Sequence, residues 1–293
     1  MDDKILKQMR KAITYILIIF FYLFAISCEK SVDLDFPEAE HQIIADGWIE
    51  QNRYPKVFVT RSLPYFSEID SATFRDLVVT KAKVSVSVDN KTEILTLHRD
   101  EKYFPPYIYQ GFQIKGKVGK TYKLEVSIGD KTLSATTSIS DPPSIDSLWT
   151  VSNPQRDTLK QIMIQFTDDP TTQNYYRLFS KIKGTNENYK PSYGSVFADG
   201  AFNGTTTTFP LFKGYTTSQT REDLYFSSGD TVYVKFCAIK KESFRFWKKF
   251  QSEQVNSVNP FATSSQEIEG NVKGDGKGIW TGYGAEYNRI IIP

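Results

Sequence analysis

The sequence is poor in the residues that most often carry metal or nucleophilic chemistry. Its 293 residues include only two cysteines and two histidines. Two cysteines cannot build a disulfide framework or a cysteine zinc cluster. A cysteine or serine nucleophile normally needs a histidine base, and neither His41 nor His98 lies in a catalytic motif. We therefore expect a protein that is not an enzyme and that has no metal or other cofactor.

An excess of charge of either sign is also missing. Residues 1–27, interpreted below as a removable signal, hold four of the 36 basic residues and two of the 34 acidic residues. The rest of the chain therefore carries 32 of each and is formally neutral. A neutral chain without a basic run has no long-range field to attract nucleic acid, so no nucleic-acid partner is expected.

Long apolar runs are absent except near the N-terminus, where one extends from Ala12 to Ile26. This run is shorter than the ~20 residues that a membrane-spanning helix needs. It follows a basic segment and ends at Ala25-Ile26-Ser27-Cys28, which resembles a bacterial lipobox. The pattern predicts a lipoprotein signal peptide over residues 1–27, cleaved before Cys28. The alternative is an ordinary N-terminal membrane anchor with an incidental cysteine.

Cys28 is the one site residue that the sequence assigns, and its predicted role is lipidation. Two or more acyl chains would hold the protein on a membrane durably. Glu29, rather than aspartate, follows the cysteine and favours an outer-membrane destination, with the cell surface as the expected face. Residues 28–42 are rich in acidic residues and predict a lipidated, solvated tether.

Short strands separated by turns are predicted from residue 43 onward. Valines alternate with serines between Val84 and Val88, which is typical of a strand with one buried face. Asp89-Asn90 and Gly129-Asp130 are hairpin turn signals. About seven such strands predict a mainly β protein with an N-terminal immunoglobulin-like β-sandwich over residues 43–140.

A second β-rich, sandwich-like domain is predicted over residues 141–293, because Pro142 and Pro143 cannot continue a sheet interior. One amphipathic helix is predicted over 243–256, with an aromatic stripe that we expect to pack on the sheet. The stripe consists of Phe244, Trp247 and Phe250. The glycine-rich segment that follows predicts a bent closing strand.

Three other features suggest chemistry but have simpler explanations. Cys237 lies in an alternating strand pattern and is expected to be a buried, inert thiol. Asp168 and Asp169 precede a proline and predict a turn, with a calcium loop as the alternative. The stretch 273–278, "KGDGKG", lacks the context of a phosphate loop and predicts a flexible turn.

Aromatic residues gather in two stretches marked by glycine or proline, "YFPPYIYQGF" and "IWTGYGAEY". Exposed tyrosine and tryptophan can stack on sugars or anchor a protein partner. Aromatic strands are also ordinary components of a sandwich core. We expect most of these side chains to be core, and the sequence leaves their ligand-binding role open.

Three segments in order resemble an uncharacterised family of Bacteroidetes outer-membrane lipoproteins, classed as a domain of unknown function. They are "IIADGWIEQNRYPKVFVTRSLPYF", "FTDDPTTQNYYRLF" and "NPFATSSQEIEGNVKGDGKGIWTGYG". The resemblance covers nearly all of the chain after the signal and implies no catalytic residues. It implies a genomic setting beside TonB-dependent receptors, which is an association and not a mechanism.

The expected function is that of a non-enzymatic accessory or ligand-binding subunit of a TonB-dependent uptake system, anchored in the outer membrane through Cys28. The alternative is a structural adhesin or envelope-assembly component, and a hydrolase built from distant residues is a third, weaker one. Converging carboxylates would favour the hydrolase, and exposed aromatic rings would favour a ligand-binding protein. An unpaired edge strand would favour assembly by strand addition.

Overall fold

The computed structural model describes residues 13–15, 41–62, 77–185, 188–214, 221–256 and 268–293. Residues 40–293 form one compact unit, and residues 1–39 form another. Within the second of these units the chain is mainly β, which confirms the predicted fold class. The predicted lipidation site Cys28, the signal cleavage point and most of the tether lie outside the described residues.

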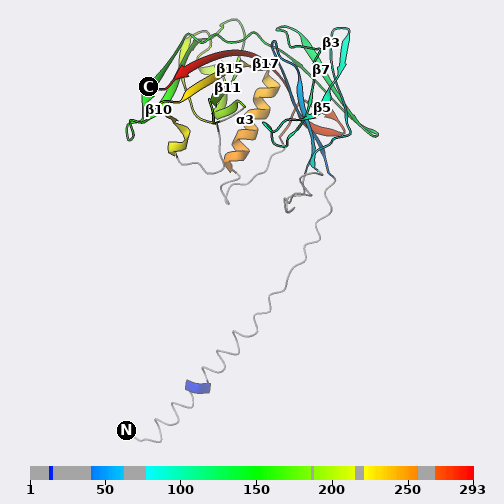
Figure 1. The fold of residues 1–293 in the computed structure, drawn as a ribbon, viewed down its shortest axis with the longest axis horizontal. Helices are drawn as coiled ribbons and strands as arrows, with labels where there is room; N and C mark the ends of the chain where they lie inside the picture. The colour runs from blue at the N-terminus through cyan, green and yellow to red at the C-terminus, as the bar shows by residue number, and fades with distance from the viewer. Residues whose placement is uncertain (1–12, 16–40, 63–76, 186–187, 215–220, 257–267) are drawn as a thin grey trace, which may run out of the picture. The chain divides into compact units, whose positions relative to one another are not determined.

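An eight-stranded sheet forms the centre of the unit and joins strands from distant parts of the sequence. Its strands, in spatial order, are β12 (Lys190–Ala198), β11 (Tyr175–Ile182), β15 (Thr231–Ala238), β17 (Gly276–Ile291), β1 (Ile43–Glu50), β2 (Lys56–Arg61), β6 (Tyr107–Gln110) and β5 (Thr96–Arg99). β17 pairs in parallel with β1 and antiparallel with β15. Figure 1 shows β17 in red, running from the side of β3 and β7 toward the side of β10.

Two smaller sheets complete the fold. The five-stranded sheet has the order β16 (Lys273–Gly274), β8 (Lys131–Ser138), β7 (Thr121–Ile128), β3 (Lys83–Val88) and β4 (Lys91–Ile94). The four-stranded sheet has the order β13 (Thr206–Leu211), β10 (Leu159–Thr167) and β14 (Phe226–Ser227), with β9 (Ser147–Ser152) also paired to β10. Helix α3 (Lys241–Asn256) and two short 3-10 helices, Asp199–Ala201 and Arg221–Leu224, are the other named elements.

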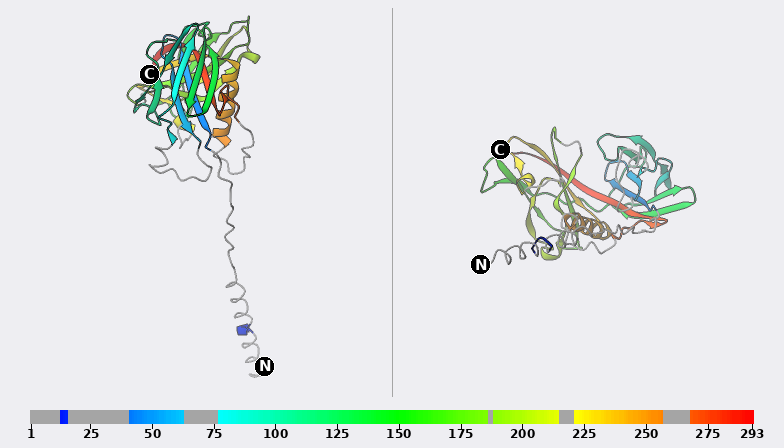
Figure 2. Two further views of the ribbon diagram at one scale, coloured as in Figure 1. Left: turned by 90° about the vertical axis from the view of Figure 1, so that its right-hand side faces the viewer. Right: turned by 90° about the horizontal axis from the view of Figure 1, so that it is seen from below.

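Both smaller sheets pack on the same face of the eight-stranded sheet. Trp280 of β17 belongs to the core beneath the five-stranded sheet, together with valines of β2 and β3. Ile290, ten positions later on the same strand, packs against the core beneath the four-stranded sheet. Because side chains alternate between faces with period two, Trp280 and Ile290 share a face. Two sandwich cores therefore form on that face, and Figure 2 shows β17 in red passing from one half of the fold to the other.

Glycines in β17 let the chain cross this strand at close range. A Cβ atom on Gly282 would lie 2.3 Å from the carbonyl oxygen of Ser138, and one on Gly284 would lie 2.0 Å from that of Ser140. Those distances leave no room for any side chain. The glycine-rich composition therefore serves the crossing of the β8 end over β17, and the predicted closing strand is confirmed.

Several local predictions are confirmed. β3 and β4 form a hairpin around Asp89-Asn90, and β7 and β8 form one around Gly129-Asp130. The predicted helix 243–256 is present and begins two residues earlier, at Lys241. Phe244 of this helix packs on Tyr175 of β11, with ring centroids 5.0 Å apart, so the aromatic stripe does face the sheet.

The predicted boundary between two domains at residue 141 stays a prediction. β17 joins β1 from the first predicted domain to β15 from the second within a single sheet. Strands β9 and β12 were not predicted. β9 lies shortly after Pro142 and Pro143, where the sequence predicted a domain boundary, and the nine residues of β12 include proline and glycine, which mask its strand pattern.

Candidate functional site

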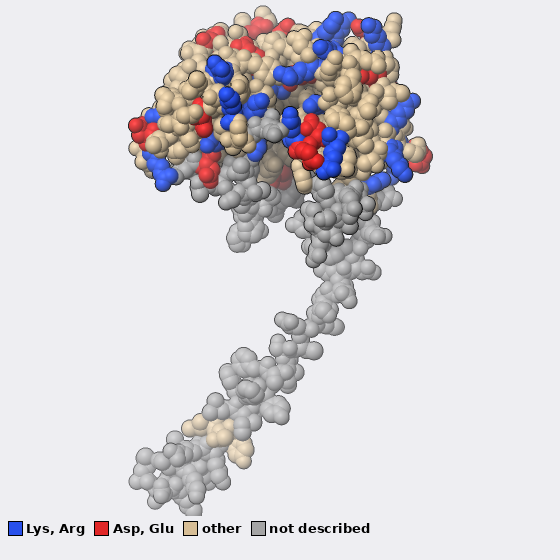
Figure 3. Space-filling model, viewed as in Figure 1, with Lys and Arg blue, Asp and Glu red and all other residues tan. Residues whose placement is uncertain are grey.

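A cleft of about 980 Å³ lies on the face of the eight-stranded sheet that the two smaller sheets leave open. Its floor is formed by β11, β15, β17, β1 and β2, and α3 and residues 100–103 contribute to its walls. On the side of the molecule shown in Figure 3, lysine and arginine side chains gather on both sides of a hollow between the two halves.

The alternation of the strands explains why these side chains meet. Every second residue of β1, β11 and β15 points into the cleft, while the intervening residues fill the two cores. The cleft-facing sets are Asp46, Trp48 and Glu50; Arg177, Phe179 and Lys181; and Tyr233 and Lys235. The register places Phe179 opposite Lys235 and Arg177 opposite Cys237.

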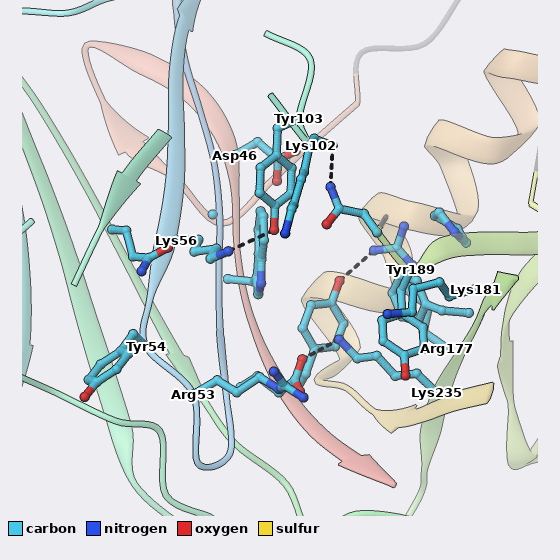
Figure 4. A pocket seen from close by; sticks show the side chains of 18 of the residues that line it. Asp46, Arg53, Tyr54, Lys56, Lys102, Tyr103, Arg177, Lys181, Tyr189 and Lys235 are labelled. Carbon is cyan, nitrogen blue, oxygen red and sulfur yellow. Dashed lines mark hydrogen bonds and ion pairs between the residues drawn. The ribbon is translucent and has the colours of Figure 1, made fainter. Parts of the chain in front are cut away.

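The lining combines aromatic rings with cations. Ten of the described residues that line the cleft are aromatic, seven are lysine or arginine, and three are aspartate or glutamate. Figure 4 shows Arg177, Lys181, Tyr189 and Lys235 on one side and Lys56 and Tyr103 on the other. Because the rest of the chain after the signal is formally neutral, this surplus of cations is a local property of the cleft.

Lys235 is a buried cation with a paired carboxylate. Its side chain is 8% exposed and forms an ion pair with Glu50, whose side chain is 3% exposed. Arg53 also contacts Glu50, with Nε 2.9 Å from Oε1. Burial lowers the pKa of Lys235, but Cys237 and Glu50 raise it, and the net shift is upward. Lys235 is therefore charged, and Glu50 neutralises it.

Arg177 is buried to a similar degree but is held differently. The residue is 3% exposed, and its Nη1 donates a hydrogen bond to the hydroxyl of Tyr283 at 2.7 Å. Its guanidinium carbon lies 3.6 Å from the ring centroid of Trp247 and 4.8 Å from that of Phe179. Aromatic faces therefore contribute much of its surroundings.

Asp46 is the acidic group that acts electrostatically on Arg177 from the cleft floor. Loss of hydration raises the pKa of Asp46 to about 6, and the positive charge of Arg177 opposes that rise. No ion pair within 4.0 Å joins the two among the described residues. Asp46 therefore changes its charge near pH 6 instead of remaining a fixed counter-ion.

Cations nearer the opening of the cleft lie over tyrosine rings. Lys56 donates a hydrogen bond to the hydroxyl of Tyr103 at 2.9 Å and lies 4.8 Å from the centroid of its ring. Lys181 lies 5.4 Å from the ring centroid of Tyr189 and 5.1 Å from that of Tyr233. Such contacts hold the long lysine chains in place.

A family model described as "Domain of unknown function (DUF4249)" matches residues 29–286. The chain belongs to this family. A search of curated proteins gives no significant match for the DUF4249 chain. All the residues that line the cleft, except Tyr287, lie within the matched range, so the cleft is part of the DUF4249 domain.

The structure also locates the other residues considered as sites. Cys237 is fully buried, and burial raises the pKa of its thiol to about 12, which confirms an inert thiol. Asp168 accepts hydrogen bonds from the hydroxyl of Tyr176 and from the backbone N–H of Gly204, and Asp169 caps the turn at Thr171. No group of three His, Cys, Asp or Glu side chains suited to a metal occurs within the described ranges.

Residues 273–278 are more regular than predicted. They contribute β16 and the start of β17, and the carboxylate of Asp275 between them accepts a hydrogen bond from the backbone N–H of Thr132 at 2.8 Å. Asp275 lies at a bend between these two strand segments, in keeping with the predicted turn, and its flexibility stays a prediction. Among the described helices, none is both long and apolar enough to span a membrane.

Sequence reasoning missed the charged residues of the cleft, although a signal was present. Asp46 and Glu50 interrupt the otherwise apolar "IIADGWIE", and Lys235 interrupts "TVYVKFCA". Charged residues at alternate positions of an apolar strand indicate a second face that is also enclosed. The aromatic stretches divide between the two roles, since Tyr103, Tyr283 and Tyr287 line the cleft whereas Tyr109 and Trp280 are core.

Proposed function

We propose that this DUF4249 protein is a non-enzymatic, lipid-anchored ligand-binding subunit associated with a TonB-dependent uptake system of the outer membrane. The observation that carries the proposal is the cleft of about 980 Å³ with its aromatic and cationic lining. This volume falls within the range of ligand sites, ~300–1,000 Å³. Aromatic rings with fixed polar groups among them are typical of surfaces that bind and orient a ligand.

The acidic residues of the cleft support binding over hydrolysis. Asp46 and Glu50 are four residues apart on one strand, so at ~3.3 Å per residue their backbones are about 13 Å apart. Paired carboxylates that act on one glycosidic bond are separated by ~5–9.5 Å. Glu50 also forms ion pairs with Lys235 and Arg53, which occupy its carboxylate.

The proposed lipid anchor and the proposed association with a receptor are supported by the sequence. The lipobox ending at Cys28 supports lipidation, and residues 29–42 support a tether between the lipid and the folded unit. Family membership supports the receptor association only through the resemblance stated above. In this proposal the ligand binds in the cleft, and the tether keeps the protein within reach of its receptor.

A structural role in adhesion or envelope assembly is the second candidate, and strand β9 favours it. β9 pairs with β10 along one side, and on its other side no strand of the described chain pairs with it. Trp149 and Val151 of β9 are 36% and 48% exposed. An apolar edge strand of this kind can accept a strand from another protein.

Detergent extraction and affinity purification from the native outer membrane test the proposal. We expect a TonB-dependent receptor to co-purify with the wild-type protein and not with a Cys28→Ala variant, which should leave the membrane fraction. Trp149→Ser serves as the matched surface variant and should retain the receptor. Purification of the protein alone, or with further copies of itself, would overturn the receptor association and favour assembly through β9.

A further inference from the structure

We infer that the corner of the cleft formed by Arg177 and Trp247 binds an acidic group of the ligand: a carboxylate, a sulfate or a phosphate. The inference rests on the proposed function, because it names the chemistry of a ligand that the cleft is proposed to bind. It is carried by two buried N–H donors that line the cleft and have no acceptor among the described residues.

The first donor is Arg177 Nε, which is buried and unpartnered within the described chain. A guanidinium presents five N–H donors, and the hydrogen bond that this one donates within the described residues runs from Nη1 to the Tyr283 hydroxyl. Tyr283 is itself a neutral acceptor, because burial raises its pKa further above its ordinary value. A buried guanidinium without a hydrogen-bonded anion is costly, since neither the charge nor the N–H groups are compensated.

The second donor is the indole Nε1 of Trp247, which is also buried and unpartnered among the described residues. Trp247 lies on α3 and stacks on the guanidinium of Arg177, so the two donors belong to one corner. An indole N–H normally finds an acceptor when it is buried. One oxyanion placed beside this corner would satisfy both donors and would compensate the charge of Arg177.

The neighbouring groups make the corner suited to an anion and not to a cation. Lys235 lies on the neighbouring strand β15, two residues from the position opposite Arg177. Lys181 lies on β11 itself, four residues after Arg177. Glu50 is already paired with Lys235, and Asp46 forms no ion pair within 4.0 Å with Arg177 among the described residues. The potential at the corner is therefore positive, and the aromatic rings nearby can pack against the rest of the ligand.

Titration of the full-length lipidated protein in detergent, followed by nitrogen-15 NMR, tests the inference at the two donors themselves. The indole N–H signal of Trp247 is assigned with Trp247→Phe, and the Nε–H signal of Arg177 with Arg177→Met. Inorganic phosphate, inorganic sulfate and glucuronate are the acidic probes; glucose and sodium chloride at matched ionic strength are the controls. The three acidic probes separate a free inorganic anion from an acidic sugar.

We expect both signals to shift in a saturable way with at least one acidic probe and with neither control. Arg177→Met should weaken that binding at least about tenfold, since a hydrogen bond to a charged group is lost. Lys123→Met, on the far side of the fold in β7, should leave it unchanged. Signals that stay still in all three acidic titrations, or a Trp247 shift that persists in Arg177→Met, would overturn the inference. Neither result would affect receptor co-purification, which tests the proposed function separately.

Discussion

Two buried cations lie on neighbouring strands of one sheet and are compensated in opposite ways. Lys235 of β15 has a buried carboxylate partner, Glu50, within the protein. Arg177 of β11 has a tyrosine hydroxyl and two aromatic faces instead. The protein thus neutralises one cation internally and leaves the other for an outside partner. A buried charge that lacks its counter-ion is more informative about function than one that is satisfied.

The largest effect on stability should follow from removing Glu50, the buried carboxylate that pairs with Lys235. Glu50→Ala leaves Lys235 buried and unpaired, so we expect the free energy of unfolding to fall by about 3–5 kcal/mol. Urea unfolding followed by circular dichroism measures the change. The double variant Glu50→Met/Lys235→Met removes both charges and should recover most of the loss. A Glu50→Ala protein as stable as the wild type would show that Lys235 does not depend on this pair.

The acidic neighbour of Arg177 should make stability depend on pH. Asp46 has a pKa of about 6 in the folded protein, against an ordinary value of 3.8. The folded state therefore binds more protons between these values, and stability falls as pH rises through this window, by up to about 3 kcal/mol. Above the window the loss is complete.

Asp46→Asn should remove this contribution. Comparing urea unfolding at pH 4 and pH 8, we expect the variant to lose less stability than the wild type over that interval and to be the more stable protein at pH 8. Equal pH dependence in both proteins would place the pKa of Asp46 near its ordinary value and would give Arg177 a permanent anionic neighbour after all.

Removal of Arg177 should have a much smaller effect on stability. Arg177→Met breaks no ion pair among the described residues, so we expect a free energy of unfolding within about 1 kcal/mol of the wild type, or above it. Lys235→Met takes the buried ion-pair partner from Glu50 and leaves it the exposed Arg53, so this contrasting variant should cost several times more. If both substitutions cost the same in urea unfolding, the distinction between the two cations fails.

The smallest effect on stability is expected at an exposed ion pair, which serves as the reference for the buried ones. Lys123 and Glu125 form an ion pair of 2.8 Å on β7 with side chains 53% and 42% exposed. Glu125→Ala should change the free energy of unfolding by less than about 1 kcal/mol, and added salt should reduce the change further. A larger cost would mean that burial is not what separates the strong pairs from the weak ones.

The sequence predicted the strands and turns whose signals are local. The hairpins at Asp89-Asn90 and Gly129-Asp130, the alternation from Val84 to Val88 and the helix near residue 243 all depend on neighbours in the chain, and all are present.

The cleft could not be predicted in the same way, because its residues come together only through pairing at long range. Arg177 and Tyr283 meet because β11 and β17 both pair with β15. A single charged residue in an apolar strand, such as Lys235, signals an enclosed second face but does not name its partner. Pairing between distant strands is set by the whole fold and leaves no mark within a short window of sequence.

The central place of β17 has a consequence for how the protein acquires its fold. β17 supplies residues to both sandwich cores, and it pairs with β1 at one edge and β15 at the other, although it comes last in the chain. Neither β1 nor β15 has its central neighbour until residues 276–291 arrive. Folding that waits for such distant contacts is slow. The two halves of the eight-stranded sheet therefore join only when residues 276–291 take their place between β1 and β15.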